Sequence, residues 1–355
     1  MMRFYSLYVQ KVIRLTSGSV RFDLLIPEHL KSIFHWKPGQ FIRFQFEING
    51  EIVERDYSIC TAPYEGYLSF VIKRTKNARV SKFVQEHIKE GFYVLVSAPI
   101  GTFGIPSRPD EKRTLAAFAS GSGISPILSI IKDTLYHESG VRFYLFYGNT
   151  NEKEVIFKNE LTKLREKNPN NFFPYFLYSQ QKMQDKLFEG KLDAHKIKLI
   201  INQIMNWDEL DEALICGPKE MIVTLANAIY EHGIPKKNIH YELYEPVEKV
   251  FHDDKIKRST VKEVKVTFTF QQSTKTMNWI NNGSSLLTAL LDSGVDAPYS
   301  CKGGVCGACI CSKKEGEVYV DENLILTEND LKNGKILTCM SHPKTETLII
   351  NLDDV

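Results

Sequence analysis

The chain has 355 residues, of which 43% are hydrophobic and 25% are charged, and its net charge is +2. This length predicts two or three globular domains, and the near-neutral charge excludes a strongly basic nucleic-acid-binding or membrane-surface protein. The N-terminus has no apolar core typical of a signal peptide and no apolar run reaches about 18 residues, so we expect a cytoplasmic protein without membrane spans.

Residues 1–108 alternate apolar and polar side chains in several short runs. The apolar positions of three such runs are Val20, Phe22, Leu24 and Ile26; Ile42, Phe44, Phe46 and Ile48; and Leu68, Phe70 and Ile72. Turn sequences such as Lys37-Pro38-Gly39 and Asn49-Gly50 separate the runs, and one helical stretch covers residues 80–89. Period-two alternation broken by turns is typical of antiparallel strands, so this region predicts a small β-barrel.

Within this barrel, Arg55-Asp56-Tyr57-Ser58 lies on a strand that enters a turn. A guanidinium fork can bind phosphate, an aromatic ring can stack on a flavin, and a hydroxyl can meet a ring nitrogen. The run therefore fits a flavin site. Taken alone, it equally fits an exposed edge-strand arginine beside a core tyrosine.

Residues 109–246 change to alternating strands and helices. Strands are predicted at residues 115–119, 141–147, 172–178, 212–216 and 239–243. Helices are predicted after Pro126 and at residues 154–167 and 219–231. This alternation indicates a parallel sheet covered by helices on both faces.

The loop Gly121-Ser122-Gly123-Ile124-Ser125-Pro126 joins the first of these strands to its helix. Glycines let a phosphate approach the backbone, and a helix N-terminus favours negative charge. Cys216-Gly217-Pro218 follows a later strand, at the edge where such sheets bind their ligands. The loop alone also fits an ordinary glycine turn, and Cys216 alone also fits a buried apolar side chain.

Residues 247–260 are charged, lack apolar periodicity and predict a linker. Residues 261–355 then form a third unit. It begins with an alternating strand at Val264, Val266, Phe268 and Phe270. A helix capped by serine starts near Leu286, and the unit ends in a strand at residues 348–352.

Four of the seven cysteines lie in this third unit with a distinctive spacing. Cys301, Cys306 and Cys309 form C-x4-C-x2-C, and Cys339 follows after 29 intervening residues. This is the plant-type ligand spacing of a [2Fe–2S] cluster, and the small residues between the cysteines leave room for it. A structural zinc site is the alternative, but such sites usually pair two short ligand units. Cys311 is a further thiol nearby, which we expect to be a packing residue.

Taken together, the motifs resemble the ferredoxin–NADP⁺ reductase family with a plant-type ferredoxin domain at the C-terminus. The resemblance rests on Arg55 to Ser58, Gly121 to Pro126, Tyr147-Gly148-Asn149, Cys216 to Pro218 and the cysteine spacing. Within the family, the chain is most similar to oxygenase reductases, in particular those of phenylacetyl-CoA epoxidase systems. It implies an FAD-binding β-barrel at residues 1–108, an NAD(P)-binding α/β domain at 109–246 and a β-grasp [2Fe–2S] domain at 261–355.

The resemblance also implies roles for individual residues. Arg55 would bind the FAD pyrophosphate, Tyr57 would cover the isoalloxazine face, and Ser58 would meet flavin N5. The other residues implied at FAD are Ile72, Lys73, Val80, Ser81, Thr102 and Phe103. Those implied at NAD(P)H are Gly121, Ser122, Gly123, Ser125, Pro126, Cys216, Gly217 and Pro218. The implied catalytic residues are Ser58, Cys216, near the nicotinamide C4, and Glu242, near the flavin edge.

The order of these parts predicts an enzyme that accepts a hydride from NAD(P)H on FAD and delivers single electrons through the cluster to an oxygenase component. Ser179-Gln180 stands where many NADP-dependent relatives carry Ser-Arg, and the missing arginine removes a bidentate partner for a 2′-phosphate, so NADH is a candidate donor beside NADPH. Two alternatives remain: a reductase for another acceptor, such as an aromatic-ring dioxygenase or a hybrid-cluster protein, and a non-enzymatic redox sensor.

Overall fold

The computed structural model describes residues 2–74, 79–205, 207–244, 249–251, 261–281, 284–300, 304, 307–320, 323 and 325–354. The chain divides into two compact units, Met1–Glu242 and Leu243–Val355, and each is described by itself. Most of the predicted linker at residues 247–260 lies outside the described residues.

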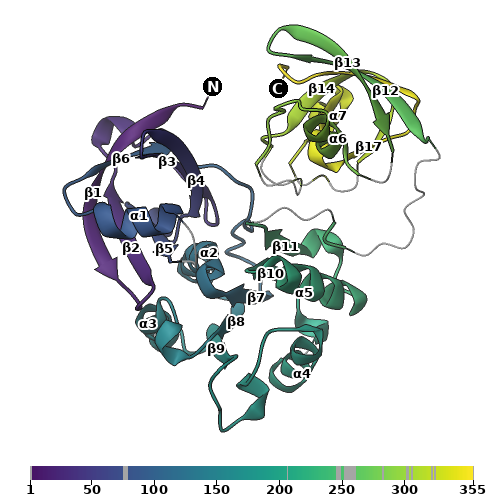
Figure 1. The fold of residues 1–355 in the computed structure, drawn as a ribbon. Helices are drawn as coiled ribbons and strands as arrows, with labels where there is room; N and C mark the ends of the chain where they lie inside the picture. Colours follow the sequence, from purple (N-terminus) through teal and green to yellow (C-terminus); the bar gives the residue numbers. More distant parts are fainter. Residues whose placement is uncertain are drawn as a thin grey trace. The chain divides into compact units, whose positions relative to one another are not determined.

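The first unit begins with six antiparallel strands in the order β4-β3-β6-β1-β2-β5. Their bounds are β1 Phe4–Arg14, β2 Ser19–Leu25, β3 Phe41–Ile48, β4 Glu51–Ser58, β5 Leu68–Lys73 and β6 Tyr93–Ser97. Figure 1 shows this sheet curling into a half-barrel near helix α1, Arg79–His87. The rings of Phe22, Phe44 and Phe70 pack inside it, with 4.3 Å between the centroids of Phe44 and Phe70. The alternating apolar positions therefore form the interior, as predicted.

The same unit continues with a five-stranded parallel sheet in the order β11-β10-β7-β8-β9. Its strands are β7 Thr114–Ser120, β8 Arg142–Asn149, β9 Phe172–Tyr178, β10 Glu212–Cys216 and β11 Ile239–Glu242. Its helices are α2 Ile124–His137, α3 Lys158–Lys167, α4 Ala194–Ile204 and α5 Lys219–Glu231. Since the chain leaves β7 toward β8 on one side and leaves β10 toward β11 on the other, the strand order reverses between β7 and β10. Ligands bind at the carboxyl ends of strands at such a point.

Two features of this sheet differ from the sequence-based prediction. The predicted helix at residues 154–167 begins only at Lys158, because Phe157 adopts a left-handed conformation with φ +64° and stops the helix from extending backward. Helix α4 was not predicted. Short 3-10 helices connect the main elements: η1 Glu28–Leu30, η2 Pro63–Glu65, η3 Gly121–Gly123, η4 Glu152–Glu154, η5 Lys186–Phe188, η6 Trp207–Glu209, η7 Lys236–Asn238 and η8 Thr338–Met340.

The second unit is a β-grasp domain with a five-stranded sheet in the order β13-β12-β18-β14-β16. These strands are β12 Glu263–Phe270, β13 Ser273–Ile280, β14 Ile310–Glu315, β16 Lys335–Leu337 and β18 Thr347–Asn351. A separate pair is formed by β15 Val318–Val320 and β17 Ser341–Pro343, and the helices are α6 Leu286–Asp292 and α7 Glu328–Lys332. As predicted, a serine caps α6: the hydroxyl of Ser285 accepts from the Thr288 N–H.

The predicted fold class is confirmed: a curled antiparallel barrel, a parallel α/β domain and a β-grasp domain follow one another along the chain. In the described part of the chain, the helices are too short or too polar to span a bilayer.

Candidate functional site

The predicted flavin motif lies at the end of β4. Arg55 and Tyr57 point to the same face of the strand, because side chains two residues apart share a face. The Tyr57 ring packs against Phe44, at 5.5 Å between centroids, and is half-buried, whereas Arg55 is exposed. Burial raises the pKa of the Tyr57 hydroxyl to about 12, so the phenol is neutral near pH 7. A cationic fork and a fixed aromatic ring are thus presented side by side, which fits the pyrophosphate and ring of FAD.

The end of β4 meets the carboxyl ends of β10 and β11. The Ser58 hydroxyl donates a long hydrogen bond of 3.5 Å to Glu242 Oε2, and both side chains are buried, with 6% and 7% exposed. Cys216 pairs with Glu242 across the parallel strands. The structure therefore brings together the three residues that the sequence predicts to be catalytic, although they come from distant parts of the chain.

The environment of Glu242 determines its protonation. Burial raises the pKa of its carboxyl to about 8, and the hydrogen bond from Ser58 only partly offsets this. Glu242 is thus protonated near pH 7. A protonated carboxyl beside a hydroxyl can hold a proton at the barrel–sheet junction and release it through Ser58 Oγ.

This burial makes stability depend on pH in a defined direction. Between the ordinary glutamate pKa of about 4.3 and the folded value of about 8, the folded chain holds a proton that the unfolded chain has released. The free energy of unfolding therefore falls as pH rises through this window, by at most about 1.4 kcal/mol per pH unit. We expect Tm to fall less between about pH 6 and about pH 8 in the Glu242→Gln variant than in the wild type, when both are compared at matched FAD content. Equal losses in both proteins would contradict a buried, protonated Glu242.

The predicted nucleotide loop forms η3 and the start of α2. A Cβ atom on Gly123 would lie 2.2 Å from the carbonyl oxygen of Cys216, so only glycine allows α2 to begin this close to the end of β10. Gly121 has φ +55°, and its carbonyl accepts a 2.8 Å hydrogen bond from the buried Tyr147 hydroxyl. The loops after β7 and β10 are thereby held side by side at the switch point.

Two polar atoms near this loop fit a nucleotide. Among the described residues, the Ser125 hydroxyl and Asn149 Oδ1 are buried without a hydrogen-bond partner. Ser125 lies in the first turn of α2, and Asn149 ends β8. Buried polar atoms are normally paired, so a phosphate or ribose hydroxyl is a suitable partner for them. Tyr147 and Asn149 were not predicted as site residues, although polar groups ending a buried strand beside a glycine loop were a usable signal.

The other predicted FAD residues lie at the barrel rim and core. Thr102 and Phe103 belong to a loop pressed against Pro38-Gly39: a Cβ on Gly39 would lie 2.0 Å from the Phe103 carbonyl oxygen. Lys73 ends β5, and its Nζ lies 3.5 Å from where a Gly121 Cβ would be, so it reaches the nucleotide loop. The remaining three are buried, one in the barrel core and two in the first turn of α1: Ile72, Val80 and Ser81.

In the second unit, two of the four predicted cluster ligands are described. The sulfurs of Cys309 and Cys339 lie 3.1 Å apart, too far for a disulfide, and both side chains are buried. Cys301 and Cys306 lie outside the described residues. Cys311 is on β14 in the apolar core, and burial raises the pKa of its thiol well above the ordinary value. Two converging sulfurs fit a thiolate-bound cluster.

Comparisons with known proteins match all three regions. The family model of the oxidoreductase FAD-binding domain matches residues 6–105, that of the oxidoreductase NAD-binding domain 118–226, and that of the 2Fe-2S iron-sulfur cluster binding domain 268–344. The chain is 32% identical to one of the subunits of the 1,2-phenylacetyl-CoA epoxidase of Escherichia coli K12, over 99% of each chain. The chain belongs to this family of NAD(P)H-dependent FAD/[2Fe–2S] reductases.

Other relatives match over most of their length. The ferredoxin reductase component of the 3-ketosteroid-9-alpha-monooxygenase of Mycobacterium tuberculosis is 31% identical, over 92% of this chain and 88% of that protein. The solved structure of phthalate dioxygenase reductase has a TM-score of 0.55 at 20% identity and covers 98% of each chain, which establishes the shared fold. This reductase therefore uses FAD, a nicotinamide nucleotide and a [2Fe–2S] cluster, as the sequence predicts.

Proposed function

We propose that this reductase delivers electrons to the oxygenase component of a phenylacetyl-CoA epoxidase. The observation that carries this proposal is the 32% identity to a protein of such an epoxidase over 99% of each chain. Because a steroid monooxygenase reductase is nearly as similar, at 31%, the acceptor has to be tested directly. Delivery to another oxygenase or to a hybrid-cluster protein is the alternative.

In this proposal the site residues keep their predicted roles. When bound, FAD accepts a hydride from NAD(P)H and passes single electrons to the [2Fe–2S] cluster. Arg55 binds the FAD pyrophosphate and Tyr57 covers the ring, supported by their common face on β4. Ser58 and Glu242 hold the proton at the flavin edge, supported by their hydrogen bond. The proposed FAD site is completed by the other residues implied by the resemblance: Ile72, Lys73, Val80, Ser81, Thr102 and Phe103.

The nucleotide is held at the carboxyl edge of the parallel sheet. Gly121, Gly123 and Ser125 bind its phosphates at the start of α2, supported by the close approach of Gly123 to Cys216. Gln180 follows β9, is exposed, and donates its backbone N–H to the Thr150 carbonyl. An amide at this position offers a 2′-phosphate no bidentate cation, so we propose NADH as a donor.

The cluster domain supplies the exit for electrons. Cys301, Cys306, Cys309 and Cys339 are the proposed ligands, supported by the adjacent sulfurs of the last two. Residues 261–355 contain nine lysines and twelve acidic residues, whereas the whole chain has a net charge of +2. The cluster domain is therefore acidic and the rest of the chain is basic, so opposite charges favour their encounter during electron transfer. The acidic domain also offers a docking surface to the electron acceptor. We propose domain limits of 1–108, 109–246 and 261–355, with a linker at 247–260.

Reconstitution tests this function. The purified reductase, mixed with an epoxidase oxygenase component, phenylacetyl-CoA and either NADH or NADPH, should form epoxide in proportion to nucleotide oxidised. The oxygenase component of a steroid monooxygenase is the matched control, and the reductase should deliver electrons to it much more slowly. Equal or faster turnover of the control would reject the epoxidase as acceptor, and no nucleotide oxidation with an artificial acceptor would favour a sensor.

A further inference from the structure

A row of side-chain contacts, called the seam below, joins helix α2 to residues 61–65 of the barrel, the segment that contains η2. The Ser129 hydroxyl donates to the Thr61 carbonyl at 2.7 Å. One turn further along α2, Lys132 Nζ lies 3.0 Å from Glu65 Oε2. These α2 residues are three positions apart and so share one helix face.

The seam extends one more turn of α2. The ring of Tyr136 stacks on that of Tyr64 in η2, with 4.2 Å between centroids and 18° between planes. Because Tyr136 follows Lys132 by four residues, it lies on the same helix face. One face of α2 therefore packs against the barrel.

Lys132 is the centre of this seam. Its side chain is only 5% exposed, and its amine also pairs with Glu160 Oε1 on α3 at 2.5 Å. Burial alone would lower the pKa of Lys132, but Glu160 and Glu65 hold it above its ordinary value, so the amine stays charged. One buried cation thus ties together the barrel, α2 and α3.

The barrel side of the network is itself tightly held. Arg21 on β2 lies 3.8 Å from the second oxygen of Glu160, and it pairs with Asp23 at 2.7 Å. It also donates to the hydroxyls of Ser69 and Tyr67, each at 2.8 Å. The carboxylate that binds Lys132 from α3 is therefore linked to two barrel strands as well.

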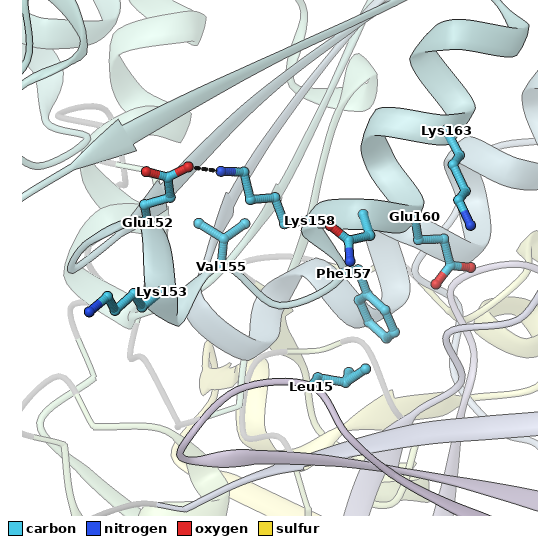
Figure 2. A pocket seen from close by; sticks show the side chains of 9 residues that line it. Leu15, Glu152, Lys153, Val155, Phe157, Lys158, Glu160 and Lys163 are labelled. Carbon is cyan, nitrogen blue, oxygen red and sulfur yellow. Dashed lines mark hydrogen bonds and ion pairs between the residues drawn. The ribbon is translucent and has the colours of Figure 1, made fainter.

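A second contact with the barrel lies just before α3, at the end of η4. The Ser17 hydroxyl, in the turn after β1, donates to Glu154 Oε1 at 2.8 Å. Figure 2 shows the Phe157 ring pointing toward Leu15 of that turn, with Glu160 and Lys163 further along α3. These residues line a hollow of about 470 Å³. Packing at this end is therefore incomplete, whereas the Lys132 amine is buried between its two carboxylate partners.

Helix α2 connects this tie directly to the nucleotide loop. Lys132 is eight residues after Ile124, the first residue of α2, which corresponds to about 12 Å along the helix axis. The loop Gly121–Gly123 immediately precedes Ile124. A helix of this length transmits a shift at one end to the other, so any movement of α2 on the barrel also moves the nucleotide loop.

We propose that Lys132 is a positioning residue for hydride transfer. Its ion pairs with Glu65 and Glu160 hold α2 on the barrel, and α2 thereby sets the distance between the nicotinamide and the flavin. The effect concerns the NAD(P)H-to-FAD half-reaction alone, so it is independent of which oxygenase accepts the electrons. A displacement of about 1 Å between reacting groups can cost about 100-fold in rate.

Anaerobic rapid mixing of the full-length holoprotein with NAD(P)H tests this directly. For Lys132→Met we expect flavin reduction at saturating nucleotide to slow by about tenfold or more, with KM changed much less. The primary deuterium isotope effect with nucleotide labelled at C4 should change, while FAD and cluster content stay at wild-type levels. Lys163→Met removes an exposed lysine from α3 and is the matched control, expected to react at the wild-type rate.

A milder variant keeps the test decisive if Lys132→Met does not fold, since that change leaves two half-buried carboxylates without their lysine. Glu65→Gln retains the side-chain shape and leaves Glu160 to pair with Lys132, so we expect a smaller loss, about threefold, in the same rate. Wild-type rates and isotope effects in the folded variants would overturn the proposal. A slower rate that only follows loss of bound FAD would overturn it too.

Discussion

Replacing Cys339 by serine should eliminate the [2Fe–2S] cluster, whereas replacing Cys311 should leave it intact. The wild-type protein should contain iron, labile sulfide and FAD in a ratio of about two to two to one. Cys339 is placed with its sulfur 3.1 Å from that of Cys309, where both can bind the same cluster. Its loss should remove most of the iron and sulfide, together with the visible absorption of the cluster, while FAD stays bound in the separate first unit.

Cys311→Ser is the matched control, because Cys311 is only two residues from Cys309 and is fully buried. Its thiol packs in the apolar core, so a buried hydroxyl there should cost about 1–3 kcal/mol of stability without releasing iron. Iron and sulfide analysis with the spectrum of the reduced cluster measures both variants. Loss of the cluster in Cys311→Ser, with retention in Cys339→Ser, would show that the ligand set is wrong.

Local patterns in the sequence were sufficient for most of the fold. The helix Lys219–Glu231 and the strand Phe172–Tyr178 have the predicted bounds, because apolar periodicity and flanking turns determine such elements locally. The start of α3 was predicted too early. Phe157 adopts a left-handed conformation, which bulky aromatic residues rarely do, so the sequence gives no sign that the helix begins after it.

The candidate site was predicted from short motifs and from the spacing of the cysteines. Gly121 to Pro126 and the cysteine spacing identify ligand types from neighbouring residues. The ion pairs of Lys132 could not be predicted, because Glu65 lies 67 residues away and a lysine on a helix normally indicates a solvated face. Likewise, the raised pKa of Glu242 depends on burial where β11 meets the end of β4, 184 residues earlier in the chain.

A chain ending at Tyr244 should separate hydride transfer from delivery of single electrons. It retains the compact unit Met1–Glu242, with the barrel, the parallel sheet and the Ser58–Glu242 contact. We therefore expect it to bind FAD and to reduce ferricyanide with NAD(P)H at close to the full-length rate, because ferricyanide can take electrons from flavin directly. It should reduce cytochrome c poorly and fail to support the oxygenase.

Two full-length variants control for this truncation. Cys306→Ser keeps the bulk of the cluster domain but removes a proposed ligand, so it should behave like the truncated chain. Tyr57→Ala should show the reverse pattern: the cluster remains, FAD is lost or loosely held, and NAD(P)H oxidation falls with every acceptor. If Cys306→Ser instead behaved like the wild type, the domain and not the cluster would be required.

The rate of oxygenase turnover supported by the truncated chain, relative to its ferricyanide rate, tests the serial path from NAD(P)H through FAD and the cluster most directly. The account predicts near-normal ferricyanide reduction with oxygenase turnover reduced to background. Full oxygenase turnover by the truncated chain would mean that electrons leave from the flavin, and the serial path would be contradicted.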